Sequence, residues 1–155
     1  MRNVLRTGLP VLLALLLATG CGTDSMEDET GLTGNSEGYA LEEVDGSDIS
    51  GSIRFEELHG GDTFVTMQLA GVDFEETYEL RLHDNTVDEG GPMRLELGEV
   101  YGVTGVNEGI INAEDNLLTY DDLIQYDGHV VVHVSENNET LVAAGNIGAN
   151  ANGDE

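Results

Sequence analysis

Basic residues, tryptophan and cysteine are scarce or absent in this 155-residue sequence. It has no lysine and no tryptophan, and five arginines stand against 31 acidic residues, for a formal net charge of −26. Binding to nucleic acid requires cationic side chains that displace counterions from the phosphates. The near absence of such side chains excludes nucleic acid as a partner.

The acidic excess has two interpretations. The first is a solvated surface adapted to concentrated salt, where charge repulsion is screened within about 3 Å at 1 M. The second is an acidic face that binds cations. We favour the first, because acidic side chains more usually form a solvated surface than a binding site.

The first twenty residues have the pattern of an export signal. A short basic segment, Met1–Arg6, precedes an apolar run, Leu9–Leu17, that is too short for a transmembrane helix. The single cysteine, Cys21, excludes an intrachain disulfide.

The run from Leu17 to Cys21 (LATGC) resembles the lipobox of bacterial lipoproteins. The resemblance implies cleavage before Cys21, lipid attachment to it, and a membrane-anchored protein that faces the periplasm or the exterior. The alternative is an ordinary cleaved signal. Residues 21–38 contain few apolar side chains and are predicted to form a flexible acidic tether.

Short segments with period-two alternation follow, separated by Gly, Asn and Asp, and they predict an all-β domain at 39–149 with a disordered tail at 150–155. Eight strands suggest a Greek-key sandwich or flattened barrel. They are predicted at Tyr39–Val44, Gly51–Leu58, Thr63–Ala70, Thr77–His83, Met93–Val100, Glu108–Asn112, Gly128–Val134 and Leu141–Ile147.

Alternation also predicts which side chains share a face. Glu79, Arg81 and His83 project together, opposite their apolar neighbours on the same strand. His129 and His133 share a face of a later strand, but four residues of strand separate them by about 13 Å, so both cannot bind one ion.

Five segments, in order, resemble the copper/zinc superoxide dismutase family. The similarity covers residues 39–149, and each motif alone is weak. The segments are Gly51–Glu56 (GSIRFE), Glu79–Asp84 (ELRLHD), Leu97–Val100 (LGEV), Val130–His133 (VVVH) and Ala144–Gly148 (AGNIG).

The resemblance implies copper ligands at His83 and His133, and places Glu96 at a zinc-ligand position. Arg81 stands where the family has another copper histidine, and a guanidinium has no free lone pair for a metal. The segment between His83 and Met93 is short and lacks histidine, so a zinc site is not expected. No residue is predicted to be catalytic.

Two functions therefore remain open. The first is a lipid-anchored binding or structural module without dismutase activity, in which Arg81 pairs with Glu96 or Asp84 and the histidines are hydrogen-bonded. The second is a divergent dismutase or metal-binding protein that holds copper through His83 and His133. The sequence does not identify a protein partner, and a homodimer is possible.

Overall fold

The computed structural model describes residues 31–134 and 140–151 of the chain. The predicted export signal, the lipidation site Cys21, most of the tether and the last residues of the tail lie outside these ranges, and they stay predictions. Within the described ranges, no helix has the length and apolar character needed to cross a membrane.

Eight antiparallel strands form the structure, which confirms the all-β prediction. Each predicted strand has its counterpart, with ends that shift by a few residues at most positions. The strands are β1 (Leu32–Glu43), β2 (Ser50–Leu58), β3 (Thr63–Ala70), β4 (Thr77–Asp84), β5 (Met93–Tyr101), β6 (Val106–Ile111), β7 (Asp127–Val134) and β8 (Leu141–Gly148).

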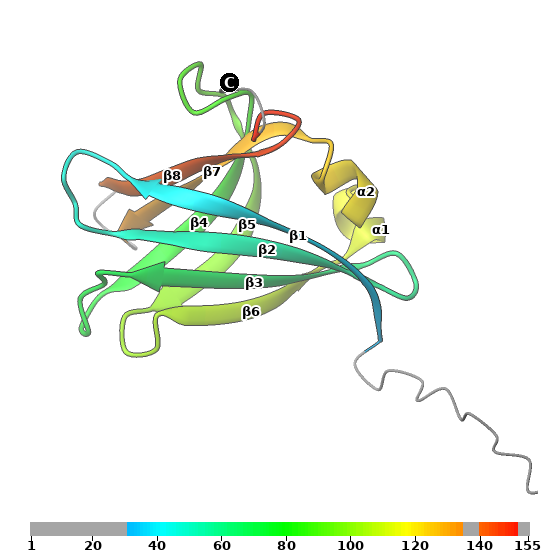
Figure 1. Ribbon diagram of the computed structural model, residues 1–155, viewed down its shortest axis with the longest axis horizontal. Coiled ribbons are helices and arrows are strands. Elements are labelled where there is room, and N and C mark those ends of the chain that lie inside the picture. The colour runs from blue at the N-terminus through cyan, green and yellow to red at the C-terminus, as the bar shows by residue number, and fades with distance from the viewer. Residues whose placement is uncertain (1–30, 135–139, 152–155) are drawn as a thin grey trace, which may run out of the picture.

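The strands follow the order β5-β4-β7-β8-β1-β2-β3-β6 in one sheet. Since β3 neighbours β6 and β4 neighbours β7, the chain crosses between the two halves of the sheet, as in Greek-key folds. In Figure 1, β1, β2, β3 and β6 run across the front while β4 and β5 pass behind them. The sheet curls into a nearly closed barrel, and Asn107 on β6 donates a 2.5 Å hydrogen bond to the Glu99 carbonyl on β5.

Alternate side chains of the strands fill the barrel. The face predicted for Glu79, Arg81 and His83 is confirmed, because the alternate residues of β4 are buried, as are those of β3: Tyr78, Leu80, Leu82, Val65, Met67 and Leu69. Phe55 on β2 is fully buried and its ring centre lies 5.9 Å from that of Tyr39 on β1. The core therefore fixes which residues of each strand face outward.

Two short helices, α1 (Ala113–Asn116) and α2 (Tyr120–Leu123), lie at one end of the barrel between β6 and β7 (Figure 1). Thr119 and Asp122 form a capping box that satisfies backbone N–H groups at the start of α2. Leu123 is fully buried in the core, so α2 closes this end of the barrel.

The predicted boundary between tether and domain at Tyr39 is wrong, because β1 begins at Leu32. Leu32 pairs with Leu58, and residues 36–41 continue the ladder with β2 after a register shift. The side chain of Thr33 also donates a 2.7 Å hydrogen bond to Glu57. Backbone pairing thus orders a segment whose polar composition alone predicted no strand.

Candidate functional site

The residues singled out from the sequence lie on the outer face of the β5-β4-β7-β8 part of the sheet. Because Leu80 and Leu82 point into the core, Glu79, Arg81 and His83 point outward, as predicted. Across this face the strand register gives three rows: His83 with His129 and Asn146, Arg81 with Val131 and Ala144, and Glu79 with His133.

Arg81 forms an ion pair with Glu79, which lies two residues before it on β4. Nε donates to Oε1 at 2.9 Å and Nη2 donates to Oε2 at 2.7 Å. Both side chains are largely shielded, with 23% and 18% of their surface exposed. The guanidinium is therefore held by a carboxylate in the forked geometry that arginine favours.

The predicted partner of Arg81 was Glu96 or Asp84. The structure corrects this prediction, because Arg81 pairs with Glu79 on its own strand. Residues two apart on a strand share a face, so both hydrogen bonds of this ion pair form within β4. Glu96 is exposed on β5 and lies opposite Arg81 in the register. Asp84 instead accepts a hydrogen bond from the Tyr126 hydroxyl.

The charges around Glu79 favour its ionised form. The hydrogen bonds from Arg81 hold the pKa of Glu79 below its usual value, and partial burial opposes this effect. The charges of Arg81 and the nearby His133 lower the pKa further. Elsewhere on this side of the barrel, burial and the bond to Asp84 raise the pKa of Tyr126 to about 12.

The structure does not bring the two predicted copper ligands together. His83 lies opposite His129 on β7, whereas His133 lies opposite Glu79. Four residues of strand separate these two positions, which corresponds to about 13 Å. A copper ion has ligand bonds of about 2 Å, so His83 and His133 do not fit one ion in this arrangement.

The loop at 85–92, between β4 and β5, holds His83 and His129. Nδ1 of His83 lies 2.9 Å from the carbonyl oxygen of Gly91, and Nδ1 of His129 lies 2.9 Å from that of Asn85. The loop is fastened to β8 by a 2.8 Å hydrogen bond from the Val87 N–H to the Asn146 side chain. His129, to which no function was assigned from the sequence, is only 4% exposed.

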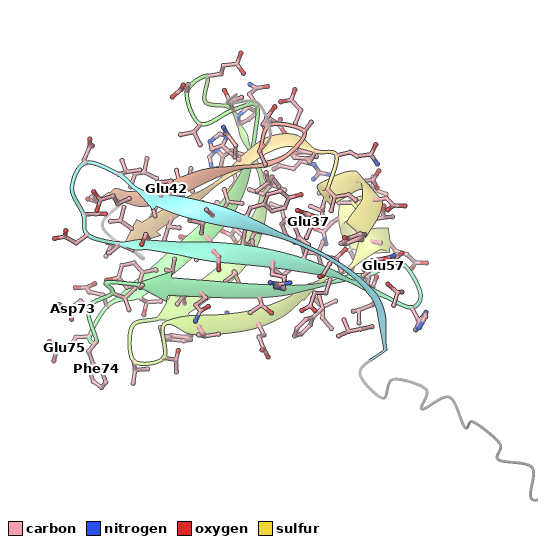
Figure 2. The ribbon with its side chains drawn as sticks, in the orientation of Figure 1. Glu37, Glu42, Glu57, Asp73, Phe74 and Glu75 are labelled. Carbon is pink, nitrogen blue, oxygen red and sulfur yellow. The ribbon has the colours of Figure 1, made fainter. Side chains whose placement is uncertain are left out.

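A hollow of about 650 Å³ opens beside this loop, between β1 and β8. The seam joins these strands at only two register positions, Glu42 with Ala144 and Glu43 with Ala143. Glu37, Glu42 and Asp88 line the hollow, so it favours cations over anions. Figure 2 shows Glu37 and Glu42 spaced along β1. No sequence pattern predicted this hollow, apart from the small residues of its walls.

The opposite end of the barrel exposes large apolar side chains on two loops. Phe74 is 71% exposed and Val103 is 58% exposed. The loops are joined by a 2.9 Å hydrogen bond from the Gly102 N–H to the Glu76 carbonyl. In Figure 2, Phe74 projects from the loop beside Asp73 and Glu75, at the end away from the helices.

Among the described residues, no group of three or more His, Cys, Asp or Glu side chains is placed to hold a metal ion. The features that remain are the Arg81–Glu79 ion pair, the His83–His129 pair, the acidic hollow and the exposed apolar loops. No protein-family model and no curated protein matches this chain.

Proposed function

We propose that this chain is an exported, lipid-anchored β-barrel module of the copper/zinc superoxide dismutase type that has kept the fold and lost the dismutase chemistry. Two observations support the relationship. Five family-like segments occur in order in the sequence. The eight antiparallel strands also form a nearly closed barrel with crossing connections, which is the architecture that the resemblance implies.

The arrangement around Arg81 is the observation that carries the loss of activity. Along β4, Arg81 lies between His83 and Glu79, and Glu79 lies opposite His133 on β7. The guanidinium of Arg81 is paired with the Glu79 carboxylate. A guanidinium has no free lone pair for a metal, so this position supplies no ligand where the family has a copper histidine. The separation of His83 and His133 also keeps the two predicted copper ligands from binding the same ion.

A binding or structural role fits the remaining surface. The exposed Phe74 and Val103 lie on loops that are joined to each other, and exposed apolar side chains gathered in this way are typical of contact surfaces. The strong negative charge favours a partner that carries positive charge. The module would thus present one end of the barrel to a protein partner while the lipid on Cys21 holds it at a membrane.

The test for lost chemistry is a dismutase assay on the full chain after loading with Cu²⁺ and removal of unbound metal. We expect no superoxide turnover above that of the unloaded protein. His133→Ala is the decisive variant and His59→Ala, at an exposed turn, is the matched control. Turnover that survives in the control and disappears in His133→Ala would overturn the proposal.

The test for the anchor is independent of the barrel. In a bacterial host, the wild-type chain is expected in the membrane fraction and Cys21→Ser in the soluble exported or uncleaved fraction, because the acyl chains supply the membrane affinity. A Cys21→Ser variant that fractionates with the wild type, with its signal cleaved, would contradict lipid attachment at this residue.

A further inference from the structure

His83 and His129 form a close pair on the outer face of the barrel. They are direct neighbours across β4 and β7, and their ring centres lie 5.4 Å apart with the ring planes at 38°. The loop at 85–92 supplies a backbone carbonyl to each ring. The pair is therefore positioned from both sides, by the strands beneath it and by the loop.

These contacts determine the tautomer of each neutral ring. A carbonyl oxygen only accepts hydrogen bonds, so Nδ1 of each histidine carries the proton that it donates. In a neutral imidazole the lone pair is then on Nε2. A backbone carbonyl that binds the proton on one ring nitrogen is also the usual support for a histidine that ligates a metal through the other.

Nε2 of His83 is buried, and no residue in the described part of the chain gives it a hydrogen bond. His129 beside it is 4% exposed. A buried acceptor without a donor costs free energy, and such groups are uncommon in native proteins unless an ion or another ligand satisfies them. The free lone pair on Nε2 of His83 thus indicates a ligand that accepts an electron pair, as a metal ion does.

We propose that His83 and His129 bind one late first-row divalent metal ion through their Nε2 atoms. Two imidazoles that bind a tetrahedral zinc ion through nitrogen at about 2.1 Å have ring centres about 5.2 Å apart. The observed 5.4 Å agrees with this spacing. Imidazole nitrogen suits nickel, copper and zinc, and water molecules complete the coordination.

This site differs from the copper position that the sequence resemblance implies, since it uses His129 in place of His133. It also does not depend on the proposed function, because two imidazoles and water hold an ion without any redox chemistry. The strong negative charge of the chain raises the local concentration of divalent cations and assists binding.

The test is titration calorimetry of the full chain with Zn²⁺, which has no redox activity of its own. All variants carry Cys21→Ser so that the thiol does not take the metal, and molar salt screens weak binding to surface carboxylates. We expect one ion per chain. Saturable binding should be lost in His83→Gln and His129→Gln and retained in His133→Gln and His59→Gln.

Three results would overturn the site: no saturable binding by the wild type, binding that persists in His129→Gln, or binding that His133→Gln also abolishes. Because His129 is buried, its variant is accompanied by nitrogen NMR of the histidine rings in the chain that retains all four. Zn²⁺ should shift the Nε2 resonances of His83 and His129 and leave those of His133 unchanged. Superoxide turnover would contradict the proposed function and leave this site unaffected.

Discussion

Replacement of Arg81 by methionine should destabilise the barrel through Glu79. The apolar chain fills much of the same space, but the Glu79 carboxylate loses both donors while its side chain stays 82% shielded from solvent, as the 18% exposure implies. It then also faces Glu99, its register neighbour on β5, without the guanidinium charge. Hydrogen bonds to charged groups contribute about 1.5–3 kcal/mol, so we expect a loss of about 2 kcal/mol.

Thermal and urea unfolding, followed by circular dichroism, measure this loss. For a domain of this size, 2 kcal/mol corresponds to a fall in Tm of about 8 °C. The pKa of Glu79 is lowered in the folded protein, so the stabilisation is present above the unfolded pKa of about 4.3 and is lost as pH falls through the folded pKa. The difference between wild type and Arg81→Met should therefore shrink in acid.

Arg54→Met is the matched control, because it removes the same charge from an exposed site. Arg54 makes only a 3.4 Å contact to Ser36, and surface contacts of this kind contribute about 0.5 kcal/mol or less. Two results would refute the argument that Arg81 stabilises the shielded Glu79 carboxylate. They are equal losses of stability in the two variants, and a loss in Arg81→Met that persists unchanged in acid.

Three further predictions concern packing and charge. Gly145→Ala should lower the free energy of unfolding by about 1–3 kcal/mol, because its Cβ would lie 2.0 Å from the Ala40 carbonyl oxygen, whereas Gly38→Ala, with ordinary contacts near 3.9 Å, should cost less than half as much. Leu123→Ala should cost about 2–5 kcal/mol in urea unfolding through a cavity under α2, and the 80% exposed Leu117→Ala about 0.5 kcal/mol or less. Removal of salt should unfold the chain, and a circular dichroism spectrum unchanged between molar and millimolar salt would contradict the halophilic interpretation.

The faces of the strands were predictable from the sequence, and the partners across the strands were not. Alternation correctly placed Glu79, Arg81 and His83 on one face of β4. However, a register shift of four residues leaves every face unchanged, so alternation does not distinguish His129 from His133 as the neighbour of His83. Only the packed barrel sets that choice.

The errors in the polar segments have a similar cause. The start of β1 at Leu32 depends on its pairing with β2, and the sequence before Tyr39 has too few apolar residues to signal a strand. The sequence shows that the 85–92 loop is short and free of histidine. However, the hydrogen bonds of His83 and His129 are accepted by backbone carbonyls of this loop, and the residue types do not reveal such contacts.

The ladder between β1 and β8 is short compared with its neighbour in the sheet. With a ladder of two register pairs, it offers far fewer interstrand hydrogen bonds than the long β1–β2 ladder beside it. Amide protons along Gly145–Gly148 should consequently exchange with deuterium sooner than those of β2 and β3. A force that pulls on the chain ahead of Leu32 acts first on β1, so the tether would transmit it directly to this short ladder.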